Sequence, residues 1–188
     1  MEAGTQNASL IPHPQSAAGC VDRIDARVAR SAGALAFGYR VLGDLSRIRV
    51  PQPRSARRAE ELWRHTCFEA FVSANDSGPY YEFNFSPSGE WAVYSFRGYR
   101  DRAPLLDVEA PEIGFRHNAT LFEFDARVAV QTLAALRAPQ LKIGLAAVIE
   151  EKEGVRHYWA LRHPPGKPDF HHADNFMLEL SSANGTER

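Results

Sequence analysis

The 188-residue sequence contains only two cysteines and three lysines, and it has no long run of apolar residues. Cys20 and Cys67 fit neither a disulfide framework nor a zinc-binding spacing, which excludes a small fold held together by cross-links. Cys67 is predicted to be a small buried hydrophobe. The longest apolar run, 145–149, is far too short to cross a bilayer. We therefore expect no membrane partner.

An excess of charge of one sign is also missing, since the formal net charge is −1. Binding to nucleic acid requires a basic field, so we expect no nucleic-acid partner. The local cluster of Arg54, Arg57, Arg58 and Arg64 is more typical of a solvated linker than of a phosphate site. The N-terminus lacks the basic start and apolar run of a secretory signal, which predicts a cytoplasmic protein.

Common catalytic motifs are absent as well. The sequence contains no glycine-rich phosphate loop and no serine nucleophile elbow. We predict a protein that binds a ligand without catalysis and assign no catalytic residue. One enzymatic alternative stays open, because Glu69 and Glu82 fall on neighbouring predicted strands, where they would serve as the paired carboxylates of a hydrolase.

What the sequence does have is a concentration of aromatic residues in the stretch 62–100. Three short runs rich in aromatic and β-branched residues are separated by turn signals at 75–79 and 86–89, a pattern that predicts an antiparallel meander. Further short strands are predicted over 20–30, 34–42 and 45–50 and in the second half of the chain. The strand spacing favours an all-β fold.

We predict an antiparallel β-sandwich, of jelly-roll or immunoglobulin-like type, with about ten or eleven strands. One or two short helices are expected, at 55–63 and 131–137. The predicted organisation is a flexible arm over 1–18, a single domain over 19–180 and a polar tail over 181–188. A parallel α/β fold is excluded because no segment between strands has the helical pattern that a crossover needs.

Side chains along a strand alternate between the two faces of a sheet, so the meander predicts one apolar and one polar face. Phe83, Phe85, Tyr94 and Phe96 are assigned to the core. The opposite face then presents a flat aromatic ring beside hydrogen-bonding groups, and these are the first candidates for ligand binding: Glu69, Glu82, Asn84, Trp91 and Arg97.

The pairing of the last two strands of the meander has an alternative. A type I turn at 86–89 with Gly89 in the left-handed region adds a bulge, pairs Phe85 with Trp91 and turns Trp91 to the apolar face. A shift of one residue moves every side chain to the other face. We favour the pairing that keeps Tyr94 and Phe96 inside, because hydrophobic pattern usually sets the register.

The polar face of the meander suits a sugar. Carbohydrates offer C–H groups to an aromatic plane, and their hydroxyls pair with carboxylates, amides and Arg. An ordinary solvated sheet surface with cross-strand Glu–Arg pairs is the alternative. The candidates for the rim of the site are Trp63, Tyr99, His171 and His172.

A metal ion and haem are the two cofactors that the sequence could suggest. The loop 163–174 is rich in His, Asp and Pro, but its spacing matches no metal motif, and we assign no metal ligand. Haem with His and Met axial ligands is an alternative for a sandwich. Met177, the single internal methionine, is better explained as core filler on a terminal strand. No cofactor is predicted.

Three segments carry a resemblance to a known family. LWRHTCFEAF, YYEFNFSPSGEWAVYSFRGYR and LRHPPGKPDFHHADNF occur in that order, and in them the chain resembles the bacterial DOMON-like proteins, which are related to the DOMON and family 9 carbohydrate-binding modules. Trp63 and Glu69 match the ends of the Trp-x-Asp-Asp-x-x-Glu pattern of the sugar-binding relatives, whereas His65 and Thr66 replace its acidic residues. The resemblance implies a β-sandwich with a pocket for a sugar or haem.

Overall fold

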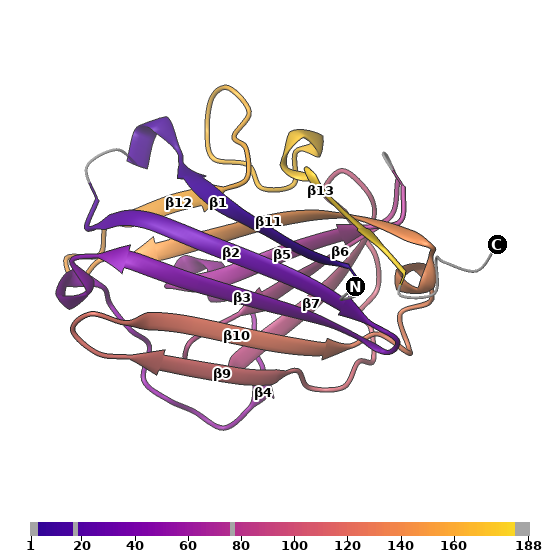
Figure 1. Ribbon diagram of the computed structural model, residues 1–188, viewed down its shortest axis with the longest axis horizontal. Helices are drawn as coiled ribbons and strands as arrows, with labels where there is room; N and C mark the ends of the chain where they lie inside the picture. Colours follow the sequence, from indigo (N-terminus) through magenta and orange to yellow (C-terminus); the bar gives the residue numbers. More distant parts are fainter. Residues whose placement is uncertain (1–3, 17–18, 76–77, 183–188) are drawn as a thin grey trace.

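The computed structural model describes residues 4–16, 19–75 and 78–182. Figure 1 shows a molecule built almost entirely of strands, and the described residues contain short 3-10 turns but no α-helix. The strands are β1 (Thr5–Pro12), β2 (Val21–Ser31), β3 (Ala34–Gly43), β4 (Arg57–Arg58), β5 (Cys67–Ser73), β6 (Tyr80–Phe85), β7 (Glu90–Gly98), β8 (Asp101–Arg102), β9 (Glu112–His117), β10 (Phe122–Ala129), β11 (Gln140–Glu150), β12 (Arg156–Ala160) and β13 (Leu178–Ser181). The 3-10 turns are η1 (Pro14–Ser16), η2 (Leu45–Arg47), η3 (Leu62–Arg64), η4 (Ala134–Arg137) and η5 (Ala173–Asn175).

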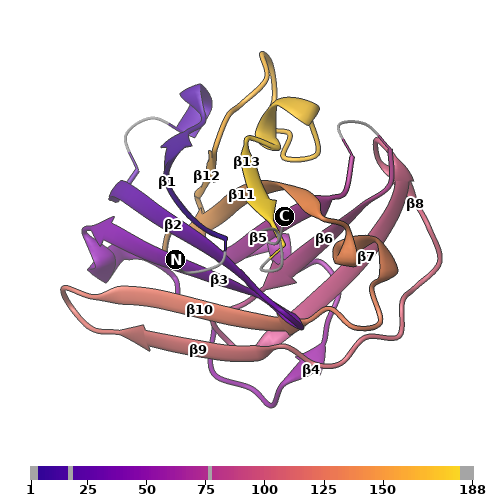
Figure 2. The same cartoon turned by 45° about the vertical axis from the view of Figure 1, so that its right-hand side comes forward.

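All of these strands belong to one sheet, which curls on itself (Figure 2). Its order is β4-β7-β6-β5-β11-β12-β1-β2-β3-β10-β9, with β13 beside β11 and β8 beside β7. The all-β class is therefore confirmed. A sandwich of two separate antiparallel sheets is not, because β1 pairs with both β2 and β12 and so joins the two halves. The sheet is also mixed, since β4 pairs with β7 in parallel.

The curl brings the inner faces of the two halves together around the main core. Phe37 of β3 lies 6.0 Å from Phe83 of β6, measured between ring centroids. Phe68 of β5 stacks on Phe124 of β10 at 4.7 Å. These rings are almost completely buried, as expected where two pleated surfaces interdigitate. The alternation predicted for β5 and β6 is confirmed.

The pairing of β6 with β7 differs from the one that the hydrophobic pattern favours. Phe85 pairs with Trp91, the alternative predicted from the turn. Gly89 has φ +93°, and its N–H donates to the Ser86 carbonyl at 3.0 Å, so the turn residues fix the register. Trp91 consequently packs in the main core, and Tyr94 and Phe96 lie on the opposite face.

Four further predictions are corrected. The segment 55–63 is no helix: its arginines at 57–58 form β4, and η3 begins at Leu62. Of the predicted helix 131–137, only η4 forms. The expected strand 45–50 is instead η2 followed by an isolated bridge from Ile48. Residues 5–12, assigned to a flexible arm, form β1 between β2 and β12.

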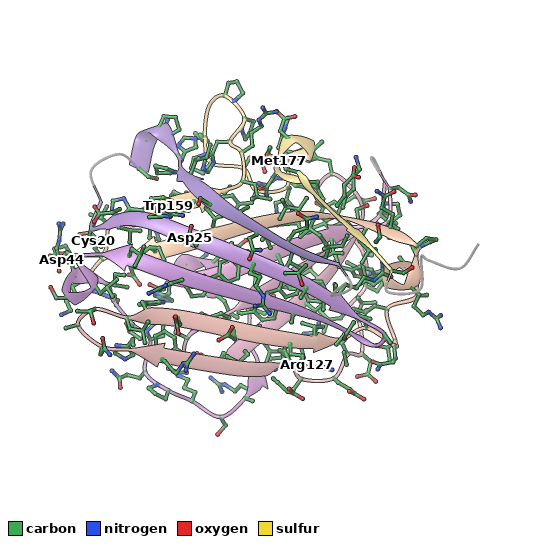
Figure 3. All side chains as sticks on the ribbon, viewed as in Figure 1. Cys20, Asp25, Asp44, Arg127, Trp159 and Met177 are labelled. Atoms are coloured by element: carbon green, nitrogen blue, oxygen red, sulfur yellow. The ribbon has the colours of Figure 1, made fainter. Side chains whose placement is uncertain are left out.

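Two further predictions concern the C-terminal part of the chain. Of the predicted polar tail, residues 183–188 lie outside the described part of the chain. Met177, expected in the core, is 50% exposed at the end of η5 (Figure 3). In residues 4–16, 19–75 and 78–182, we find no helix that is long and apolar enough to span a membrane.

A second, smaller apolar cluster covers the outer face of β5, β6, β7, β11 and β12. Its members include Phe71, Tyr80, Phe96 and Phe170. In the described part of the chain, no second layer of strands packs on this face. Instead, η1, the segment around η3 and the loop between β12 and η5 lie over it, and η1 and that loop rise on the same side of the molecule in Figure 1. Irregular segments pack less regularly than strands, which leaves room for a cavity.

Candidate functional site

A cavity of about 1050 Å³ opens on this outer face. Its residues come from distant parts of the sequence, since η1 contributes Gln15 and Ser16, and the loop before η5 contributes Lys167 and His171. The aromatic residues of its wall are Trp63, Tyr94, Phe96, Tyr158 and Phe170. The charged residues are Glu60, Glu61, Glu69, Glu82, Arg100, Arg102, Arg156 and Lys167. Aromatic walls with a few convergent polar groups are typical of a site for a small molecule.

Two buried carboxyl groups form the floor of the cavity. Glu69 on β5 and Glu82 on β6 are 3% and 5% exposed. Glu69 pairs across the strands with Asn84, and Glu82 pairs with Phe71, so the two carboxyls are diagonal neighbours on one face. Strand alternation puts them on the outer face, beneath the segments that cover it.

Glu82 is held by hydrogen bonds, whereas Glu69 is not. The Asn84 amide donates through Nδ2 to Glu82 Oε1 at 2.6 Å. Glu69 Oε1 is buried and has no hydrogen-bond partner among the described residues. Because an unpaired buried polar atom is costly, it indicates a position where a bound molecule would supply a donor.

His171 faces Glu82 from the loop before η5. The Arg100 backbone N–H donates to the Tyr80 hydroxyl at 3.2 Å, so this hydroxyl is free to donate its own proton to His171 Nδ1, 2.7 Å away. The neutral imidazole then carries its proton on Nε2, which lies 3.6 Å from Glu82 Oε2. His171 therefore presents a donor to the floor.

Burial shifts the pKa values of all three groups toward their neutral forms. It raises the pKa of Glu82 to about 7, opposed by the Asn84 hydrogen bond and the charge of Arg100. Burial, reinforced by the charge of Glu82, holds the pKa of Glu69 well above its ordinary value. Burial, together with the charge of Arg100, lowers the pKa of His171 to about 4. Near neutral pH the floor therefore holds less charge than its composition indicates.

Four of the nine predicted site residues line the cavity: Glu69, Glu82, Trp63 and His171. A fifth, Asn84, is buried and positions Glu82. Trp91 does not face the cavity. Its ring lies in the main core on the opposite face of β7, because the turn at 86–89 shifts the register by one residue.

The three remaining candidates lie outside the main cavity. Arg97 points to solvent and forms an ion pair with Asp101 at 2.8 Å. Tyr99 is 62% exposed, and its hydroxyl donates to Asp169. The side chain of His172 accepts from the Asp174 backbone N–H at the start of η5. In the described parts of the chain, no group of three or more His, Cys, Asp or Glu side chains is arranged to hold a metal ion.

Sequence reasoning missed several lining residues. Tyr94 and Phe96 were assigned to the core. The turn signal at Gly89 predicts the other register, and that register places both side chains in the wall of the cavity. Arg100 and Arg102 had no such signal, because their position depends on the short β7–β8 pairing and on Asp169 from a distant loop.

Comparison with known proteins gives a fold but no family. Neither a protein-family model nor a curated protein matches the chain, so the resemblance to the DOMON-like proteins remains a prediction. A crystal structure of a Bacteroides uniformis protein, provisionally described as carbohydrate-binding, is similar with TM-score 0.68 and 15% identity over 96% of this chain and 86% of that one.

Two structures of a family 9 carbohydrate-binding module from Caldicellulosiruptor kristjanssonii are also similar. One is in complex with glucose and the other with cellotriose. Each has TM-score 0.59 and 11% identity over 92% of this chain, and the match covers 82% and 83% of the two module chains. At such low identity, the likeness establishes that this chain shares the fold of these modules.

Proposed function

We propose that this chain is a carbohydrate-binding protein and that the cavity on the outer face of β5, β6 and β7 receives the sugar. The observation that carries the proposal is the composition of this cavity, in which aromatic rings surround two buried carboxyls. Rings such as Trp63 offer a plane to sugar C–H groups, and the unpaired Glu69 Oε1 accepts from a hydroxyl.

The fold supports the same assignment. The similar structures include a module in complex with glucose and with cellotriose. On this basis, together with the three motif segments, we also propose that the curled sheet is a DOMON-like β-sandwich. Haem is the weaker alternative, because Met177 is half-exposed and does not line the cavity.

We propose binding without turnover. Hydrolysis of a glycoside by paired carboxylates requires one of them to be ionised as nucleophile or base. Burial raises the pKa of both Glu69 and Glu82 and so favours the protonated form of each. A panel of chromogenic glycosides tests this step, and release of the chromophore that Glu82→Gln abolishes would establish an enzyme.

Two tryptophans provide the test of binding. Trp63 is 42% exposed and lines the cavity, whereas Trp91 is buried on the other face of the sheet. Titration calorimetry with glucose, cellotriose and the hits of a glycan array should detect binding. We expect Trp63→Ala to weaken the affinity at least tenfold, a loss of about 1.4 kcal/mol.

Trp91→Phe is the matched control and should leave the affinity unchanged once the variant is shown to be folded. An unchanged isotherm for Trp63→Ala would show that the sugar binds at another site. Absence of binding to every sugar on the array would refute the function itself.

A further inference from the structure

The floor of the cavity contains buried acid without a matching cation. Among the described residues, no Arg or Lys forms an ion pair with Glu69 or Glu82. Arg100 lines the same cavity, but its Nη2 lies 2.7 Å from Asp169 Oδ1. Arg102 is likewise paired with Glu60, at 3.2 Å. Each nearby guanidinium therefore has an acidic partner of its own, and its charge only partly offsets the effect of burial on the pKa of Glu82.

The unpaired oxygen of Glu69 points to a missing donor. Glu69 is only 3% exposed, and it lines the cavity. The Asn84 amide, a neutral donor at the floor, donates to Glu82 and not to Glu69 Oε1. His171 is a neutral neighbour of Glu82 and brings no positive charge. A bound molecule that brings both a donor and a positive charge would satisfy this floor best.

The walls of the cavity also suit a cation. The faces of aromatic rings carry negative electrostatic potential and attract ammonium and guanidinium groups. One such contact already exists here, since the Arg102 guanidinium lies over the Tyr94 ring at 4.0 Å. Phe96 and Phe170 extend the aromatic surface around the carboxyls. A ring with both hydroxyls and an ammonium group would use every feature of this cavity.

We propose that the floor formed by Glu69 and Glu82 binds a protonated amine, so that the ligand of the cavity is an amino sugar. The proposal rests on the proposed function, because it names the class of carbohydrate that the same site takes. The ammonium group donates to Glu69 Oε1 and lies between the two carboxyls, and the sugar ring packs against the aromatic walls. A neutral sugar supplies the donors but brings no charge that would favour ionisation of the carboxyls.

Binding of this kind is coupled to a proton. In the free protein, burial raises the pKa of Glu82 to about 7, so this carboxyl retains a proton at mildly acidic pH. An ammonium group favours the ionised carboxylate, and the displaced proton passes to solvent. The titratable and charged groups that interact with the two carboxyls are Glu60, Cys67, Tyr80, Tyr94, Arg100, Arg102 and His171, and Tyr39 from the opposite face of the sheet. Affinity for the amine should therefore rise with pH up to the pKa of the amine itself.

Calorimetry with the full chain tests the inference on three sugars: glucosamine, N-acetylglucosamine and glucose. Each is titrated at about pH 5.5, 6.5 and 7.5, in two buffers of different ionisation enthalpy that together report proton release. We expect glucosamine to bind at least tenfold more tightly than glucose at pH 6.5. N-acetylglucosamine, which lacks the charge, should have no such advantage. Proton release should accompany glucosamine alone.

Two variants locate the effect. Glu69→Gln and Glu82→Gln should each remove most of the preference for glucosamine over glucose and the proton release. Glu109→Gln is the control, because Glu109 is exposed and does not line the cavity. It should retain both effects. The comparison of sugars on the unmodified chain does not depend on whether either floor variant folds.

The possible failures are distinguishable. Equal affinity for glucose and glucosamine, or a preference that both floor variants retain, would overturn the amino-sugar inference and leave carbohydrate binding intact. Absence of binding to all three sugars and to cellotriose would overturn the proposed function and the inference together.

Discussion

The two faces of β5 and β6 are both buried, yet they are built from different side chains. The inner face contains Phe68, Phe83 and Phe85, and the outer face contains Glu69, Glu82 and Asn84. The inner face packs against β3 and β10 through closely packed aromatic rings. Irregular segments cover the outer face and leave a cavity of about 1050 Å³. The kind of cover, rather than the extent of burial, decides where this fold accepts carboxyl groups.

The largest difference between the faces should be seen in stability. Phe83 is fully buried in the inner core, so Phe83→Ala loses apolar burial and leaves a cavity. We expect the free energy of unfolding, measured by urea titration, to fall by about 3–5 kcal/mol. Leu105→Ala is the control, because Leu105 is 62% exposed and its truncation should change little. A loss of under 1 kcal/mol for Phe83→Ala would contradict the inner packing described above.

The outer face should instead respond to pH. Burial raises the pKa of Glu82 from 4.5 to about 7, so the folded chain holds a proton that the unfolded chain releases. This contribution to stability is full below pH 4.5 and is lost as the pH rises through 7. Relative to the original chain, Glu82→Gln should become more stable by about 3 kcal/mol over this range. Urea unfolding at several pH values measures this difference, with the exposed Glu109→Gln as control. A pH-independent difference would show that folding leaves the pKa of Glu82 unchanged.

His171 should show an effect of similar size and opposite pH dependence. Burial lowers the pKa of His171 from 6.5 to about 4, so the unfolded chain binds a proton that the folded chain rejects. This contribution to stability is present above pH 6.5 and is lost as the pH falls to 4. His171→Gln should therefore gain about 3 kcal/mol over the original chain across this acid range, again measured by urea unfolding. His172→Gln serves as control, because His172 is partly exposed. An equal gain in stability for this variant would show that burial of His171 is not the cause of the effect.

The smallest effect is expected at Arg97, outside both buried faces. Its ion pair with Asp101 is largely exposed, and such pairs contribute little to stability. Arg97→Ala should leave both the melting temperature and the affinity for sugar within measurement error. A clear loss of sugar affinity would show that Arg97 contributes to the binding site, as the sequence analysis predicted.

The strands show which predictions a local pattern supports. Apolar and polar residues alternate without ambiguity in β5 and β6, and the faces of these strands were predicted correctly. In β7 both alternating sets are apolar, with Trp91 and Val93 in one and Tyr94 and Phe96 in the other. Pattern alone therefore favoured the wrong register. The hydrogen bonds of the turn at Gly89 decided it.

Segments without strong alternation were predicted least well. Ser55 and the helix formers after it suggested a helix over 55–63. Instead, the backbone of Arg57 and Arg58 pairs in parallel with β7 as strand β4. The polar N-terminal residues gave no sign of β1, because its strand is formed by pairing with β2 and β12. Propensity is weak in short segments, and neighbouring strands override it.

By itself, the sequence determined that the chain is all-β and that Glu69 and Glu82 lie on one face of adjacent strands. These properties follow from the two-residue period of a strand, which is local and readable. Only the tertiary structure decided that this face is buried, that Trp91 belongs to the core, and that His171 reaches Glu82 from a distant loop. Those contacts depend on turn geometry and on the closure of long loops, and no local pattern in the sequence specifies them.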